Sequence, residues 1–331
     1  MRLGIVPWLA LLTACGGGSH AHVVRIPKGA GGVGFLPLLV MEKYRLVEKY
    51  AGESGIGDLT VRWMDLGGPA AMNDALLSSS ADFISAGPPA FLTLWDKTRG
   101  SANVEGVAAM TSLPMYLNTN SERLKKLDDI TDKDKIAVTS IKVSIPAIVM
   151  QMYATEKYGP AQATRFDKFT VSMAHPDAVV ALLSGGAGIS AHFSSPPFHQ
   201  RERKDPRIRT ILTSDDVMGG STTFTMISTT AKFREENPQI FAAVLKALEE
   251  ANRMIVADKN MAADLLVTSE SGGLTREEIA EVLNDPRVKF TTTPENVMKY
   301  AGFMADTGSL KNRPGSWKDL FFSEIHGAPG S

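Results

Sequence analysis

Polar or glycine-rich segments follow three expected strands, at 86–89, 139–144 and 192–195. The first two lead directly into expected helices. The first N–H groups of a helix lack partners within it and carry partial positive charge, so an anion can bind there without enzyme machinery. Ser140 and Ser144 would add hydroxyl groups and Lys142 a full charge; alternatively, the serines are simple N-caps and the lysine lies in solvent. Because such segments occur in both halves of the chain, we expect a ligand site between two domains.

A glycine-rich segment at 29–34 matches G-x-G-x-x-G, a pattern that lets the backbone approach a pyrophosphate. It follows an expected strand and precedes an expected helix. A dinucleotide site also needs an acidic residue about 20 residues later, but the candidate here, Asp65, comes later than that, and Pro37 interrupts the first helical turns. We therefore favour a loop whose N–H groups face another small ligand.

Hydrolytic chemistry has little support, because the chain lacks G-x-S-x-G, H-E-x-x-H and a cysteine nucleophile. His175 precedes Pro176 and is interpreted as a residue at a helix start rather than a base. His192 ends an apolar strand, and strand ends in α/β sheets face the ligand crevice; it is a candidate contact, with a buried structural role as the alternative. The other histidines show no metal-ligand spacing, so the sequence predicts neither metal nor cofactor.

Cys15 is the single cysteine, and it closes an apolar stretch that follows Arg2. This is the layout of a secretory signal peptide, and the small residue before the cysteine resembles a bacterial lipobox, in which the thiol is acylated. The alternative is a chance cysteine in an ordinary signal peptide. The apolar stretch is shorter than the roughly 20 residues of a membrane span. With 16–21 as a flexible tether, we expect a lipid anchor on Cys15 and a periplasmic or cell-envelope location.

Composition describes an ordinary soluble globular protein: 331 residues, 44% hydrophobic, 21% charged and a net charge of −1. This length suffices for two domains with their own cores. The sequence shows no concentration of basic residues that could displace counterions from nucleic acid. Nucleic acid is therefore excluded as a partner. No cysteine after Cys15 remains for a disulfide or a thiolate metal site. The partners should be small molecules or other proteins.

Alternating patterns position these segments. Strand-like and helix-like runs alternate from residue 22, which predicts largely parallel sheets with helices on both faces. The pattern starts afresh after the charged connector at 128–134, and the last third is mostly helical, with proposed helix starts at Asn237–Pro238, Thr275 and Thr293. We expect strands at 22–26, 59–64, 81–86, 104–112, 115–118, 135–138, 169–173 and 189–193, and helices at 35–49, 69–77, 88–95, 144–158 and 177–183.

Three sequence runs carry a resemblance to a known family. They are the helix-to-strand steps 75–83 and 181–191, and the segment 233–238 ahead of a long helix. With 317–322 near the end, their order is similar to that in substrate-binding lipoproteins of bacterial ABC importers, of the nitrate/taurine/alkanesulfonate class. Ser79–Ser80 and Gly188–Ser190 depart from the family pattern, and no arginine typical of a sulfonate site is found.

The resemblance implies a type II periplasmic binding protein fold, with two α/β lobes and a ligand cleft between them. Lobe 1 would be 22–117 plus 216–331, and lobe 2 would be 118–215. Each lobe would hold a mixed, mostly parallel sheet. Carried over by position, the ligand-binding residues would be Gly31, Gly32, Phe35, Gly67, Gly68, Ala86, Gly87, Pro88, Ser140, Lys142, Ser144, His192, Phe193, Ser194, Ser221 and Thr222.

The implied function is capture of a small solute and its delivery to a membrane permease with its ATPase, by a monomer without enzyme activity. The expected ligand is a small anion, such as a sulfonate or nitrate-like ion, or a small heterocycle. One alternative is an enzyme on the same scaffold, pyrimidine-forming or nicotinamide-dependent, that uses the loop 29–34. Another is a surface receptor without a small ligand.

Overall fold

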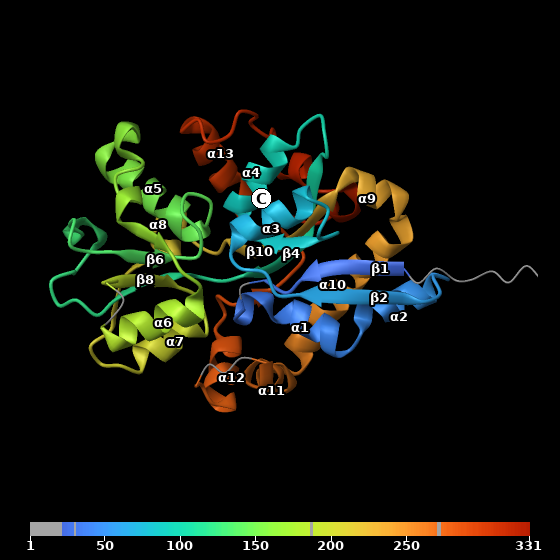
Figure 1. The fold of residues 1–331 in the computed structure, drawn as a ribbon, viewed down its shortest axis with the longest axis horizontal. Helices are drawn as coiled ribbons and strands as arrows, with labels where there is room; N and C mark the ends of the chain where they lie inside the picture. Colours follow the sequence, from blue (N-terminus) through green and yellow to red (C-terminus); the bar gives the residue numbers. More distant parts are fainter. Residues whose placement is uncertain (1–21, 30, 186–187, 270–272) are drawn as a thin grey trace, which may run out of the picture.

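Separate β-sheets form the framework of the molecule, and the chain passes between them twice (Figure 1). The computed structural model describes residues 22–29, 31–185, 188–269 and 273–331. The predicted signal segment, its tether and Cys15 lie outside these described residues. No helix among the described residues has the length and apolar character needed to cross a bilayer.

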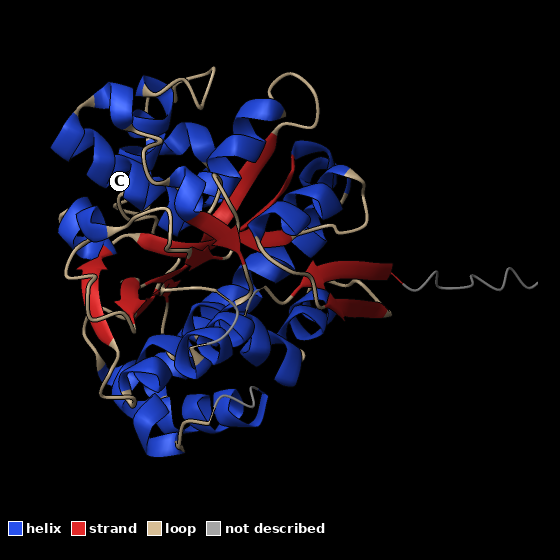
Figure 2. Cartoon of the chain, turned by 60° about the vertical axis from the view of Figure 1, so that its left-hand side comes forward, coloured by secondary structure: helices blue, strands red, loops and turns tan. Residues whose placement is uncertain are grey.

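One sheet has four strands in the order β11 (Lys289–Phe290), β4 (Val104–Ser112), β10 (Thr223–Thr230) and β3 (Ile84–Ala86). A parallel pair, β1 (His22–Pro27) and β2 (Leu59–Met64), lies in the same half of the molecule (Figure 1). The second sheet has five strands in the order β7 (Thr170–Ser172), β6 (Ile136–Val138), β8 (Ala191–Ser194), β5 (Tyr116–Thr119) and β9 (Arg209–Thr213). Helices cover both halves, as Figure 2 shows, so the expected two-lobed α/β architecture is confirmed.

The chain crosses from the first half to the second between β4 and β5, and returns between α8 (Ser214–Met218) and β10. We call the first half lobe 1 and the second lobe 2. The boundaries at 117/118 and 215/216 stay a prediction. The first falls within β5 (Tyr116–Thr119) and the second within α8.

The expectation of mostly parallel sheets is wrong. Parallel pairing occurs between β1 and β2 and between β6 and its neighbours β7 and β8. Every pair in the four-stranded sheet is antiparallel, and β5 is antiparallel to both β8 and β9. Parallel neighbours require a crossover, usually a helix. The strands at the two crossings, β4, β5 and β10, are not joined to their sheet neighbours by such a crossover. The alternation of strands and helices in the sequence therefore did not predict their direction.

Most expected helices are present, with bounds that shift by a few residues. The helix expected over 35–49 is two helices, because Arg45 between them has a left-handed backbone with φ 50°. The helices of the two lobes are α1 (Leu36–Lys43), α2 (Leu46–Glu53), α3 (Pro69–Leu77), α4 (Pro88–Lys97), α5 (Ile145–Tyr158), α6 (His175–Ser184), α7 (Phe198–Arg203), α9 (Ala231–Glu236), α10 (Pro238–Ala257), α11 (Lys259–Ser269), α12 (Arg276–Asn284) and α13 (Val297–Asp306).

Two proposed helix starts in the last third are confirmed and one is wrong. Proline begins α10 after Asn237, and the Thr275 hydroxyl accepts from the Glu278 N–H at the start of α12. Thr293 begins no helix. The Glu295 N–H donates instead to the Thr223 hydroxyl, and the Pro294 carbonyl accepts from the N–H of Ser331. These bonds hold the segment against β10 and the last residue, so α13 begins only at Val297.

Candidate functional site

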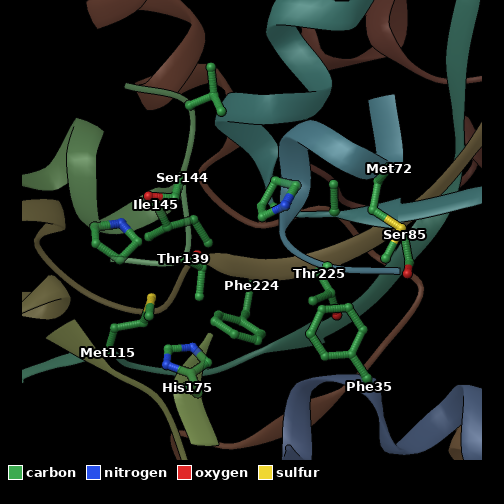
Figure 3. A pocket seen from close by; sticks show the side chains of 16 residues that line it. Phe35, Met72, Ser85, Met115, Thr139, Ser144, Ile145, His175, Phe224 and Thr225 are labelled. Carbon is green, nitrogen blue, oxygen red and sulfur yellow. The ribbon is translucent and has the colours of Figure 1, made fainter. Parts of the chain in front are cut away.

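The first turns of α3, α4, α5 and α6 converge on a cavity between the two lobes (Figure 3). Its volume is about 40 Å³. Each of these helices follows the carboxyl end of a strand, which is where α/β folds place their ligand sites. Both lobes and the connection between them supply its lining: Phe35, Gly67, Pro69, Met72, Ser85, Ala86, Gly87, Met115, Thr139, Val143, Ser144, Ile145, Pro146, His175, Phe224 and Thr225.

Five residues predicted from the sequence lie in this lining: Phe35, Gly67, Ala86, Gly87 and Ser144. Ala86 ends β3 and Gly87 is the N-cap of α4, so the strand-to-helix turn brings both to the cavity. Ser144 is the N-cap of α5 in the other lobe. The prediction that strand-end segments from both halves meet at one place therefore agrees with this geometry.

Other predicted residues hold the lobes close together beside the cavity. A Cβ on Gly68 would lie 2.5 Å from the Thr139 carbonyl oxygen and 2.8 Å from the Ser140 hydroxyl. A Cβ on Gly32 would lie 2.9 Å from the Pro196 carbonyl oxygen, which accepts the Val33 N–H at 3.1 Å. Glycine at 68 and 32 thus permits backbone of one lobe to touch backbone of the other.

Lys142 lies outside the cavity. Its side chain is exposed, and it lines a separate surface groove with Gln151, Asp167 and Asp306. The lysine charge acts on Asp167, where it opposes the rise in carboxyl pKa that burial causes. The structure therefore does not place this cation where a ligand in the cavity would meet it.

His192 lies behind the cavity wall, in a chain of buried side chains that ends at His175. His192 Nε2 is 2.8 Å from His175 Nδ1, and His192 Nδ1 bonds the Glu202 carboxylate. The other Glu202 oxygen accepts from Asn118 Nδ2 at 2.6 Å. At the opposite end, the Ser195 hydroxyl is 3.3 Å from His175 Nε2. His192 and Glu202 are 0% exposed, and Ser195 is 1% exposed.

This chain determines how the His175 ring is used. A carboxylate only accepts, so Glu202 accepts a hydrogen bond from the Nδ1–H of His192, and His192 Nε2 then accepts from His175 Nδ1. His175 Nε2 is left to accept from the Ser195 hydroxyl. Burial, and secondly the neighbouring His192, hold the pKa of His175 well below its ordinary value. The ring therefore meets the cavity uncharged, with both nitrogens bonded to protein groups.

The remaining predicted residues support the site without lining it. Pro88 is buried at the first position of α4, and Gly31 precedes the turn that leads to Phe35. Phe193 and Ser194 are fully buried in β8. The last two, Ser221 and Thr222, lie at the return crossing, where the Ser221 carbonyl accepts from Asn296 Nδ2 at 2.7 Å.

Thr139 and Val143 belong to the segment 139–144 that the sequence suggested. Sequence reasoning missed nine other lining residues: Pro69, Met72, Ser85, Met115, Ile145, Pro146, His175, Phe224 and Thr225. Ser85 adjoins the predicted residue Ala86, and extending that segment by one position would have found it. The first turn of the helix after β7 also carried a signal, because His175 begins α6 directly before a proline, as Ile145 begins α5. Phe224 and Thr225, in the returning strand β10, carried none.

The glycine-rich segment makes room for protein atoms. A Cβ on Gly29 would lie 2.0 Å from the Phe35 ring, and one on Gly34 would lie 2.1 Å from the Phe224 ring. Both rings line the cavity. The pattern that resembled a dinucleotide motif is thus explained, at these positions, by the packing of two aromatic side chains.

No protein-family model matches the sequence, and no curated protein sequence matches it. Among the residues that the structure describes, no group of three or more His, Cys, Asp or Glu side chains is arranged to hold a metal ion.

Solved structures with the same fold include alkanesulfonate-binding proteins. The structure is similar to SsuA of Xanthomonas axonopodis pv. citri bound to MOPS, with a TM-score of 0.67 and 15% identity over 88% of this chain and 95% of that one. SsuA of Escherichia coli has a TM-score of 0.60 and 16% identity, covering 92% of each chain. A zinc-bound ligand-binding component of an ABC-type import system from Staphylococcus aureus has a TM-score of 0.62 and 13% identity over 92% and 98%. The chain therefore has the fold of periplasmic binding proteins.

Proposed function

We propose that this protein is the extracytoplasmic solute-binding component of an ABC importer. The observation that carries the proposal is a cavity whose walls come from both lobes, at the first turns of four helices. A solute in that position contacts both lobes at once, so it stabilises the closed arrangement by its differential affinity for the closed and open states. The protein would then present the solute to a permease and its cytoplasmic ATPase.

The fold similarity supports this proposal, since the neighbours named above are binding proteins or components of import systems. The predicted lipid anchor on Cys15 would keep a monomer at the outer face of the membrane, in the periplasm or cell envelope. A tethered receptor stays close to the permease that it serves, which raises its effective concentration there.

The cavity lining supports binding without covalent chemistry. Ser144 donates its hydroxyl proton to the Ser140 carbonyl at 2.6 Å, and Thr225 lies 2.7 Å from the Gly34 carbonyl. A nucleophilic hydroxyl needs a base that takes its proton, whereas these hydroxyls are directed at carbonyl groups. Ser195, which contacts His175, is outside the lining and nearly inaccessible.

A cavity-filling variant tests the proposal. Val143 lines the cavity, and Val143→Phe adds volume there; Ile141→Phe makes a similar change at a side chain that is 42% exposed outside it. We expect small solutes that raise the melting temperature of the natural protein and of Ile141→Phe to leave Val143→Phe unaffected. Mass spectrometry of the solute released by denaturation should return it with its mass unchanged.

Two outcomes contradict the proposal. Equal stabilisation of Val143→Phe and Ile141→Phe would show that the solute binds elsewhere. A released molecule with an altered mass would show turnover and favour an enzyme.

A further inference from the structure

We propose that the cavity selects small, uncharged and largely apolar molecules that carry a hydrogen-bond donor, and that it excludes anions. This inference rests on the proposed function and specifies its solute. It departs from the sulfonate or nitrate-like anion that the sequence suggested, and from the ligand class in the names of the SsuA neighbours.

The first support is the absence of charge in the lining. Among the described residues, the cavity is lined by no Lys, Arg, Asp or Glu side chain. His175 is the sole titratable group there, and its low pKa keeps it neutral at pH 7. A buried anion without a counter-charge loses several kcal/mol of solvation. An uncharged solute does not incur this cost.

The second support is the apolar character of most of the wall. The apolar side chains of Phe35, Met72, Met115, Ile145 and Phe224 line the cavity (Figure 3), as does Val143. Phe35 and Phe224 have their rings 6.2 Å apart in an edge-to-face arrangement. These groups stabilise apolar solute surface by removing it from water, but offer no hydrogen bond to a sulfonate or a nitrate.

The third support is the direction of the hydroxyl groups. Ser144 donates to the Ser140 carbonyl, and Ser85 to the Pro27 carbonyl at 3.5 Å. The Thr225 hydroxyl lies 2.7 Å from both the Gly34 carbonyl and the Thr111 hydroxyl, so its proton is directed at a protein group in either arrangement. A hydroxyl that has used its single proton keeps only lone pairs, which accept. These three groups therefore favour a solute that donates. Thr139 is the fourth hydroxyl of the lining.

The fourth support concerns the helix ends, which the sequence suggested as anion sites. Proline has no N–H to offer an anion. It occupies the first or second position of every helix that meets the cavity: Pro69 in α3, Pro88 and Pro89 in α4, Pro146 in α5 and Pro176 in α6. In α4 it removes both of the first two donors. The partial positive charge that remains at these ends lacks much of the hydrogen bonding that makes such sites bind anions.

The cavity volume limits the size of the solute. One water needs about 10–15 Å³ on this measure, so about 40 Å³ holds roughly three waters. In the described conformation the lobes therefore enclose only a few non-hydrogen atoms. A longer apolar solute requires them to separate slightly.

Matched pairs of probes test the inference by isothermal titration at pH 7. Methanesulfonamide and benzenesulfonamide are compared with methanesulfonate and benzenesulfonate, and acetamide with acetate. Each pair has nearly the same shape, but one member is neutral with an N–H donor and the other is anionic. We expect at least one neutral member to bind, about tenfold or more tighter than its anionic counterpart. Dimethyl sulfone, which is neutral without a donor, should bind more weakly than methanesulfonamide.

Variants at Thr139 test the cause of the selectivity. Thr139→Lys places a cation at the half-buried wall, and Thr139→Gln is its neutral control of similar length. We expect Thr139→Lys, and not Thr139→Gln, to improve sulfonate binding about tenfold or more. Continued exclusion of sulfonates by a folded Thr139→Lys protein would contradict the argument that the missing cation is the cause.

The outcomes separate this inference from the proposed function. Tighter binding of the anionic members, abolished by Val143→Phe, would overturn the inference and leave solute capture intact. If no probe of either kind binds, the named solute class is wrong. Native mass spectrometry of the purified protein then decides the broader function by whether a solute is retained.

Discussion

The backbone at Lys142 has a φ of 68°, in the left-handed region that side chains with a Cβ rarely adopt. This conformation costs roughly 1–2 kcal/mol for an L-residue other than glycine. We expect Lys142→Gly to exceed Lys142→Ala in stability by roughly 0.5–1 kcal/mol after the greater unfolded-state entropy of glycine is included. Urea denaturation measures the difference. Neither variant should change the affinity of a cavity ligand, and a loss of affinity in both would place the lysine in the site.

Glu202 is the acceptor for two buried side chains, His192 and Asn118. Removing one member of a buried hydrogen-bond network leaves the others without partners. We expect Glu202→Ala to lower the free energy of unfolding by about 2–4 kcal/mol, because two buried donors lose their acceptor. Glu202→Gln, which retains the volume and one acceptor, should cost less. A loss below about 1 kcal/mol for Glu202→Ala in urea denaturation would contradict the buried network.

The two histidines show how far residue types could be interpreted from sequence. His192 was a candidate contact because it lies near a strand end. It is fully buried and does not line the cavity, but it contacts His175, which does. His175 was interpreted as a residue at a helix start, which it is, and it also lines the cavity. The hydrogen bond between the two histidines joins a residue of β8 to a residue of α6. The sequence pattern does not specify which of these two buried rings faces the cavity.

At the scale of elements, the two lobes come close together where the N-cap of α3 meets Thr139, the residue after β6. Gly68 has an ordinary φ of −72°, so its role is steric. We expect Gly68→Ala to weaken ligand binding about tenfold, because a Cβ 2.5 Å from the Thr139 carbonyl oxygen must push the lobes apart. Calorimetry measures the affinity, and small-angle scattering the accompanying expansion.

Gly52→Ala is the matched control, since a Cβ there meets no atom within 4 Å and alanine suits the last turn of α2. Unchanged affinity and compactness in Gly68→Ala would show that the ligand-bound lobes do not come this close.

Elements with strong local signals were predicted well, and those determined by distant contacts were not. β2 and the start of α3 match the expected bounds, because alternation and a proline start are local features. The break at Arg45 and the late start of α13 depend on chain direction and on bonds to Thr223 and Ser331. The prediction of strand direction was wrong for the same reason. The pairing of β4 with β10 depends on how the chain passes between the lobes, which is not a local feature.

At the scale of the whole molecule, stability should depend on pH between about 4 and 6.5. Burial, assisted by the positive charges of Arg203 and Arg287, lowers the pKa of His199 from 6.5 to about 4. Below pH 6.5 the unfolded chain therefore binds a proton at His199 that the folded protein does not bind. The free energy of unfolding falls as the pH falls through this window. Burial lowers the pKa of His175 too, which adds to the effect.

Comparison with His199→Gln isolates this contribution, because Asp167 and Asp215, whose carboxyl pKa burial raises, act in the opposite direction in both proteins. We expect the natural protein to lose roughly 3 kcal/mol more than the variant between pH 7 and pH 4. Parallel stability curves in urea denaturation would contradict the assigned pKa.

The two-lobed architecture was predictable because the sequence repeats its α/β alternation after residue 128 and resembles a family with that fold. The chemical character of the cleft was not. Serines, a lysine and helix starts are the same residue types whether they meet a ligand, a carbonyl group or solvent. Only the three-dimensional structure shows that Lys142 faces another groove and that the hydroxyl of Ser144 is directed at a carbonyl.

The carbonyl of Gly34 lies between the two crossing strands, where it accepts from Thr111 of β4 at 3.1 Å and from Thr225 of β10 at 2.7 Å. Phe35, the next residue, lines the cavity. A solute that contacts the Phe35 ring is therefore coupled, through the adjacent Gly34 carbonyl, to the two strands that connect the lobes. We expect solute binding and lobe closure to occur together. The backbone amides of β4 and β10 should then show slower hydrogen exchange at the same time, when the solute binds.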